Sequence, residues 1–133
     1  MSKDKFYLEF KVKDKEISLR NLDELRNNFF IEQIMEHYYS GKLEEWLEVW
    51  HYQDELEKVR AIGTRNYKTI AAKLGSIFKV DVKSYDIEKG LETWNAKKGL
   101  DYYNENNYSK AAEFFRKAEK QGNAEAQFYL SFV

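Results

Sequence analysis

Two histidines are the first side chains of this sequence to consider for metal or acid–base chemistry. The chain contains His37 and His51 but no cysteine, so a metal ion would also need carboxylates such as Glu36 or Glu48. The two histidines are 14 residues apart and fall in different predicted helices. The sequence therefore favours two solvated or helix-surface histidines, and we expect neither a metal site nor a cofactor.

Adjacent carboxylates are the second candidate for chemistry. They occur at Glu44-Glu45 and Asp54-Glu55, where a pair could share the acid and base roles of a glycosidase. At 34% charged residues, however, such pairs arise by chance on solvated helix faces. The serines fall at predicted caps or helix ends, and the glycines are too scattered to form a phosphate-binding loop. We therefore expect a non-catalytic protein, and a small enzyme is our third hypothesis.

Charge is divided unevenly between two neighbouring segments. Residues 32–58 carry eight acidic and two basic side chains, net −6, whereas residues 60–83 carry six basic and one acidic, net +5. This pattern would suit a protein partner of complementary charge, and it makes Glu44, Glu45 and Glu48 predicted partner contacts. The alternative is that the two segments simply face each other as solvated neighbours.

The basic segment suggests an alternative function, which is RNA binding in a regulator. Arg65, Lys68 and Lys73 would contact phosphates, and Tyr67 would stack on a base. The formal net charge of the chain is −1, which argues against a general nucleic-acid or membrane-surface binder. We therefore rank RNA binding below protein binding.

The N-terminal part of the chain reads as a hairpin followed by helices. Residues 5–13 alternate between apolar and polar side chains, and Ile17 with Leu19 could form a short second strand. Apolar residues at helical spacing then predict a helix capped by Asn21, a helix from Phe29 to about Ser40, and further helices up to residue 78. Thr64 is the predicted cap of the last of these. Residues 1–83 thus predict a β-hairpin packed on a helical bundle.

The remaining residues, 84–133, predict two antiparallel helices and the start of a third. A long helix opens at Ser84 or Asp86 and runs into Gly99, where the missing side chain lets a neighbouring helix come close. A turn at residues 104–107 precedes a second helix, whose apolar side chains Ala111, Phe114, Phe115 and Ala118 have i, i+3, i+4, i+7 spacing. The small alanines leave room that Phe115 fills.

These residues resemble a known repeat. Gly99, Tyr102, Tyr108, Ala111, Phe115 and Ala118 have the spacing of a tetratricopeptide repeat, and AAEFFRKAEKQGNAEAQFYL is similar to the related Sel1-like repeat. The resemblance covers residues 94–133 and implies one helix hairpin with a partial second repeat. It also implies a concave protein-binding surface on the first helix, with Asn95, Lys98 and Tyr103 as partner contacts. Phe128, Leu130 and Phe132 form a final apolar face through which the chain could pair with a second copy.

Function and location follow from these patterns as expectations. The sequence MSKDKFYLEFKVKDKE has no continuous apolar run, so we expect no signal peptide and no membrane span, and the absence of cysteine suits a reducing cytoplasm. The block NLDELRNNF…GKLEEWLEVW resembles a small helical module of bacterial multidomain proteins, and the 17 lysines against 5 arginines suggest a bacterial or phage genome. We expect a protein-binding adaptor or stoichiometric inhibitor of a bacterial partner, a description that a phage-encoded antagonist of a host defence nuclease would fit.

Overall fold

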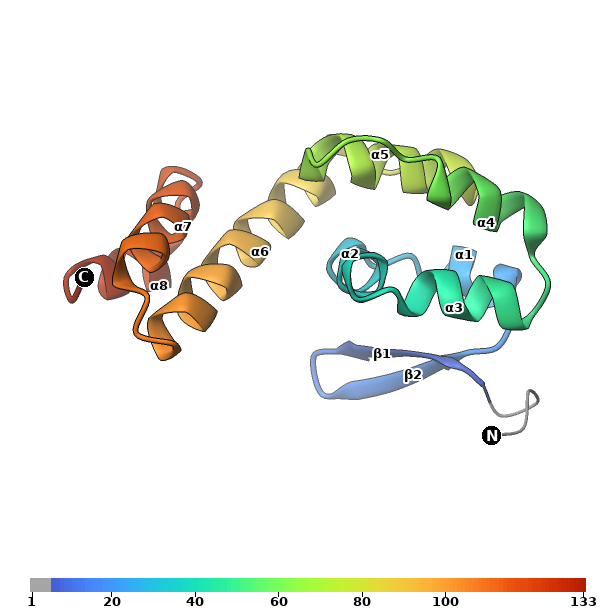
Figure 1. Cartoon of the computed structure of the whole chain (residues 1–133), viewed down its shortest axis with the longest axis horizontal. Coiled ribbons are helices and arrows are strands. Elements are labelled where there is room, and N and C mark those ends of the chain that lie inside the picture. Colours follow the sequence, from blue (N-terminus) through green and yellow to red (C-terminus); the bar gives the residue numbers. More distant parts are fainter. Residues whose placement is uncertain (1–5) are drawn as a thin grey trace. The chain divides into compact units, whose positions relative to one another are not determined.

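The computed structural model describes residues 6–133 of the chain, which divides into two compact units, Met1–Lys83 and Ser84–Val133. The described residues are mainly α-helical with an N-terminal β-hairpin, as the sequence predicted (Figure 1). The first unit contains β1 (Leu8–Val12), β2 (Lys15–Leu19), α1 (Leu22–Asn27), α2 (Ile31–Ser40), α3 (Lys42–Val49), α4 (Gln53–Arg60) and α5 (Tyr67–Ile77). The second contains α6 (Ser84–Asn104), α7 (Tyr108–Lys120) and α8 (Ala124–Leu130). None of the described helices is both long and apolar enough to cross a membrane.

The hairpin confirms the alternation that the sequence predicted. Strands β1 and β2 pair antiparallel in a register that runs from Leu8 opposite Leu19 to Val12 opposite Lys15. Leu8, Phe10 and Leu19 are buried, while the intervening residues of β1 face solvent. Residue 5, where the predicted strand began, lies outside the described residues. Because a two-stranded hairpin alone is marginal in water, its buried face must pack on the helices of this unit.

The helices of the first unit begin and end at residues with special backbone roles. Asn21 caps α1 by accepting a 2.9 Å hydrogen bond from the Glu24 amide, and Gly41 ends α2 with a φ of +83°. Two boundaries differ from prediction: α2 starts at Ile31 rather than Phe29, and α5 is capped by Asn66 rather than Thr64. The Thr64 hydroxyl instead accepts from the Asn66 amide, so it supports the cap from two residues upstream.

The second unit is organised around a close contact between α6 and α7. The Phe115 ring lies directly over Gly99, and a Cβ built at Gly99 would stand 2.6 Å from the Phe115 ring. Phe115 forms the core of this unit with Ala111, Ala118 and Ala126, all of them fully buried. The sequence predicted both the close approach at Gly99 and the role of Phe115 in filling the space. The small side chains therefore set the distance between the helices, and Phe115 sets their register.

We predict that Gly99→Ala destabilises the second unit, although Gly→Ala inside a helix ordinarily stabilises by about 1 kcal/mol. The new methyl group would overlap the Phe115 ring, and overpacking of this kind costs about 1–3 kcal/mol. Hydrogen exchange of the α6 and α7 amides in the full chain measures the effect. The double variant Gly99→Ala with Phe115→Leu is the matched control, because the smaller side chain makes room for the methyl group. Unchanged or increased protection in Gly99→Ala would contradict the contact.

Candidate functional site

A surface built from both helices of the second unit is the candidate functional site. Its members are three partly buried aromatic side chains and three lysines, and we call it the aromatic–lysine surface: Trp94, Lys98 and Tyr102 on α6, and Lys110, Phe114 and Lys117 on α7. The Phe114 ring lies between the other two rings, edge-on to Trp94 at 5.8 Å and stacked on Tyr102 at 5.6 Å between centroids. The rings therefore form one continuous patch across the helix pair.

Each lysine of this surface lies over one of the rings. The ammonium group of Lys98 is 5.6 Å from the Trp94 centroid, that of Lys110 is 5.7 Å from Tyr102, and that of Lys117 is 4.8 Å from Phe114. Contacts of this kind stabilise by about 0.5–1 kcal/mol at exposed sites, and they restrict the long lysine side chains. Lys117 also lies 3.9 Å from the Glu113 carboxylate. The surface thus holds positive charge and apolar area side by side.

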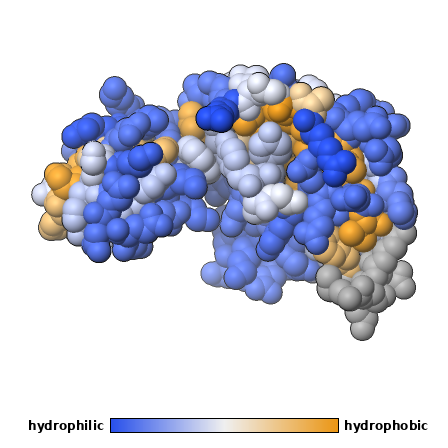
Figure 2. All heavy atoms as spheres, in the orientation of Figure 1, coloured by the Kyte–Doolittle hydropathy of each residue, from blue (hydrophilic) through white to orange (hydrophobic). Residues whose placement is uncertain are grey.

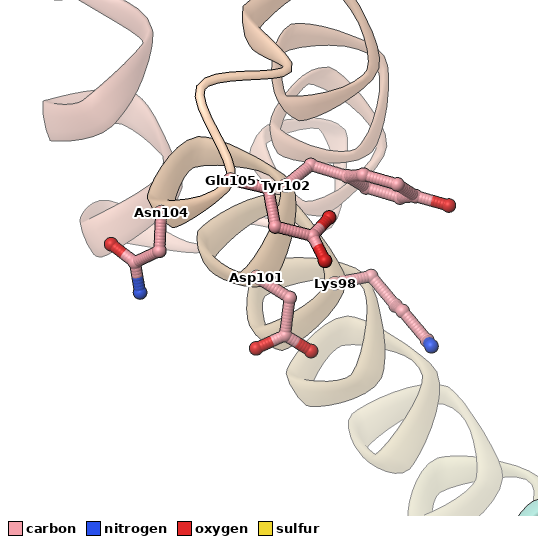
Figure 3. Close-up of a pocket in the computed structure, with 5 residues that line it drawn as sticks. All are labelled: Lys98, Asp101, Tyr102, Asn104 and Glu105. Carbon is pink, nitrogen blue, oxygen red and sulfur yellow. The ribbon is translucent and has the colours of Figure 1, made fainter.

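An open hollow of about 330 Å³ adjoins this surface at the C-terminal end of α6 (Figure 3). Lys98 and Tyr102 line it together with Asp101, Asn104 and Glu105. Figure 3 shows the Lys98 chain, the Tyr102 ring and the Glu105 carboxylate on one side of the helix, with Asn104 pointing away from them. The hollow therefore offers a cation, an aromatic hydroxyl and carboxylates within a small area.

The three residues predicted as partner contacts on α6 differ in how far they are exposed. Lys98 is partly exposed and belongs to the aromatic–lysine surface, as a contact residue would. Asn95 is only 5% exposed and donates a 3.0 Å hydrogen bond to the Gln121 side chain, so its prediction as a surface contact was wrong. Tyr103 packs against the core of the unit, with its ring 5.4 Å from that of Tyr129. Both Asn95 and Tyr103 face the third helix, α8, and its connection to α7, which the repeat spacing alone did not place.

The acidic residues predicted as partner contacts lie on α3 and are partly engaged within the first unit. Arg60 donates to Glu44 at 3.3 Å and lies 3.7 Å from the Glu48 carboxylate. The acidic and basic segments thus meet at Arg60, in line with the alternative that they are solvated neighbours. Glu45 is exposed and borders a hollow of about 380 Å³ next to β1, beside Lys42.

The residues predicted to contact RNA are not all on the surface. Arg65, Lys68 and Lys73 are exposed, but Tyr67 is 5% exposed and cannot stack on a base, so that prediction was wrong. Burial, with a smaller effect from the nearby Glu32 carboxylate, raises the pKa of the Tyr67 hydroxyl well above its usual value. Tyr67 is the first residue of α5, and its side chain points into the core of the unit with Ile70 and Leu74.

The histidines and carboxylates considered for chemistry are dispersed. His37 is buried rather than on the surface: its ring Nε2 donates to the Glu9 carbonyl, and the ring lies 5.2 Å from Phe10. His51 is exposed, in a turn. Among residues 6–133, no group of three or more metal-ligating side chains comes together. His37 therefore serves to fix β1 against α2.

The C-terminal helix exposes part of the apolar face that the sequence predicted. Phe128 and Phe132 are each 59% exposed and contact one another edge-on at 5.0 Å, whereas Leu130 packs against the core of the second unit. Figure 2 shows hydrophobic surface at this end of the chain. Two of the three residues predicted for pairing with a second copy are thus available on the surface.

Comparisons with known proteins identify no relative. No protein-family model matches the chain, and no curated protein or solved structure matches it. The argument about function therefore depends on the side chains described above. Most of the aromatic–lysine surface was missed from the sequence, although its members recur every three or four residues, at 94, 98 and 102 and at 110, 114 and 117.

We predict that Asn95→Ala lowers the free energy of unfolding more than Lys98→Ala does, because Asn95 is a buried structural residue and Lys98 is a surface residue. Asn95→Ala removes a buried hydrogen bond and leaves Gln121 without its donor, which should lower the free energy of unfolding by about 1–2 kcal/mol. Lys98→Ala removes a partly exposed cation and its contact with Trp94, and it should lower the free energy of unfolding by only about 0.5 kcal/mol, the lower end of the range for such contacts. Urea denaturation followed by circular dichroism measures both. Equal effects of the two substitutions would contradict this distinction.

Proposed function

We propose that the chain is a non-catalytic protein-binding module of the bacterial cytoplasm, an adaptor or stoichiometric inhibitor, whose partner docks on the aromatic–lysine surface. The observation that carries this proposal is the set of three lysines, each over an aromatic ring, contributed by two packed helices. Aromatic side chains dominate the binding energy of protein interfaces, and they do so best when they are rigid. The cations select for acidic side chains on the partner.

The likeness of the hairpin to Sel1-like and tetratricopeptide repeats also supports this proposal. Gly99 beneath Phe115, with fully buried Ala111 and Ala118, is the packing that the repeat resemblance implies. Such repeats present partners with a surface made by successive helices. Here α6 and α7 together supply that surface, and Lys98 is the predicted contact residue within it.

The partner that fits this surface is a protein segment carrying carboxylates next to aromatic or aliphatic side chains. The ammonium groups lie over the rings. A partner carboxylate can therefore reach the cations while its apolar neighbours cover the parts of the rings that remain exposed. Glu113 near Lys117 and Asp101 with Glu105 beside Lys98 leave carboxylates among the cations. This mixture suits a defined protein surface better than the uniformly negative backbone of a nucleic acid.

A pull-down with the tagged full chain from bacterial lysate, with and without nuclease treatment, tests the proposal. We predict one protein captured in stoichiometric amount that is retained after nuclease treatment. The triple variant Lys98→Ser, Lys110→Ser and Lys117→Ser should lose it, with at least about tenfold less capture, because three interfacial cations are removed. The matched control is Lys120→Ser, an exposed lysine on the same helix α7.

Two results would contradict this assignment. If the captured material disappears with nuclease, RNA binding through Arg65, Lys68 and Lys73 becomes the better explanation, and Lys68→Glu with Lys73→Glu should then abolish it. If a protein is captured equally by the triple variant and by Lys120→Ser, the partner binds elsewhere on the chain.

A further inference from the structure

The outer edges of β1 and β2 differ in whether their backbone amides and carbonyls have hydrogen-bond partners. The Glu9 carbonyl accepts from His37, and the Lys11 amide donates to the Gln33 side chain at 2.7 Å, so the backbone groups of these two residues point away from β2. In the antiparallel register they lie opposite Ser18 and Glu16, respectively. Two residues that lie opposite each other in an antiparallel pair of strands either both direct their backbone groups toward the other strand or both direct them away from it. The amides and carbonyls of Glu16 and Ser18 therefore point away from β1.

Side chains of α2 thus bind the outer edge of β1 at two backbone groups, whereas the outer edge of β2 is open. Within residues 6–133, no hydrogen bond reaches the backbone amide or carbonyl of Glu16 or Ser18 from outside the hairpin. Both residues are exposed. Figure 1 shows β2 at the margin of the first unit, with β1 nearer to α2 and α3. Four strong hydrogen-bonding groups therefore stand in a row along an unpaired strand, which is a template for another strand.

We propose that β2 of a second copy of this chain pairs antiparallel with this edge, on a two-fold axis through Ile17, so that two hairpins form a four-stranded sheet. In this register Glu16 lies opposite Ser18 of the second copy, and Ser18 lies opposite its Glu16. Each pair exchanges two backbone hydrogen bonds, and the four bonds engage all the outward amides and carbonyls of both residues in each copy.

Neighbouring registers are less favourable. A two-fold axis at Glu16 sets two glutamates directly opposite each other, and one at Lys15 does the same for two lysines, which is destabilising. An axis at Ser18 would require the Arg20 amide as a donor, but this amide already donates to the Glu24 carboxylate at 3.0 Å. The register centred on Ile17 therefore avoids like-charge pairs and uses only groups that are open.

The side chains of the centred register are self-complementary. Ile17, only partly buried in the single chain, meets Ile17 of the second copy on the apolar face of the sheet. At the ends of the paired strands, the turn residue Asp14 comes near Arg20 of the second copy, where the arginine would be shared with Glu24, 2.9 Å from it in the same chain. Lysines at a sheet edge ordinarily discourage pairing, yet Lys15 here lies opposite the uncharged Leu19. Charge thus permits this register and favours it at Asp14.

Cross-linking through introduced cysteines in the full chain tests the arrangement, because the chain has no cysteine of its own. Glu16→Cys and Ser18→Cys are exposed and leave the core intact. Mixing these two variants should give a disulfide-linked heterodimer at least about tenfold faster than either variant links to itself. Directly opposed residues have Cα atoms about 5.5 Å apart, within disulfide range, whereas identical residues offset by two positions are too distant.

Ser18→Pro measures the contribution of the backbone in the same chain. Proline removes the outward amide without touching the β1–β2 hydrogen bonds, and it should weaken dimerisation about tenfold or more in sedimentation equilibrium. Ser18→Ala is the matched control, since both substitutions lose the 2.8 Å hydrogen bond from the Ser18 hydroxyl to Glu9. Ser18→Ala should dimerise like the unaltered chain, and so should Phe128→Ser with Phe132→Ser.

Three outcomes would overturn the proposal. The first is a chain that remains monomeric up to about 1 mM, the weakest affinity of interest, which would leave an extended segment of another protein as the occupant of this edge. The second is equal cross-linking of the mixture and of the separate cysteine variants. The third is a dimer abolished by Phe128→Ser with Phe132→Ser, which would place the interface on α8 instead.

Discussion

The second unit of this protein depends on the absence of a side chain at Gly99. The Phe115 ring occupies the space where a Cβ would stand, so α6 and α7 approach as closely as backbone and ring allow. The contact fixes the register of the two helices. The register in turn brings Phe114 between Trp94 and Tyr102. The candidate binding surface is thus a consequence of the same packing that forms the core.

The first unit depends on a different requirement: the apolar face and the outer edges of its short β-hairpin must be covered. Apolar side chains cover its buried face. At the outer edge of β1, His37 donates a hydrogen bond to the Glu9 carbonyl, and the Gln33 side chain accepts one from the Lys11 amide. A histidine that could have suggested chemistry is thereby a structural donor. The edge of β2 receives no such cover from the described residues. The two proposals accordingly concern two separate surfaces: the aromatic–lysine surface of the second unit for a protein partner, and the β2 edge of the first unit for a second copy of the chain.

The sequence could predict features that depend on residues close together in the chain, but not contacts between residues far apart in it. The strand alternation, the Asn21 cap and the approach at Gly99 depend on nearby residues or on a strong spacing pattern, and these predictions were confirmed. The burial of Asn95 depends on Gln121, which is 26 residues away and reaches Asn95 only after α7 has turned back. The burial of Tyr67 depends on which face of α5 meets the core. Such contacts between distant residues carry no local signature.

Hydrogen exchange of the full chain carrying Phe115→Ala tests the central claim most directly. If the contact with Gly99 organises the second unit, amides of α6 from about residue 94 onward, of α7 and of α8 should lose protection together. The amides of α2 to α5 should keep theirs, because these helices belong to the other unit. Loss of protection confined to α7, with α6 and α8 unchanged, would contradict the account.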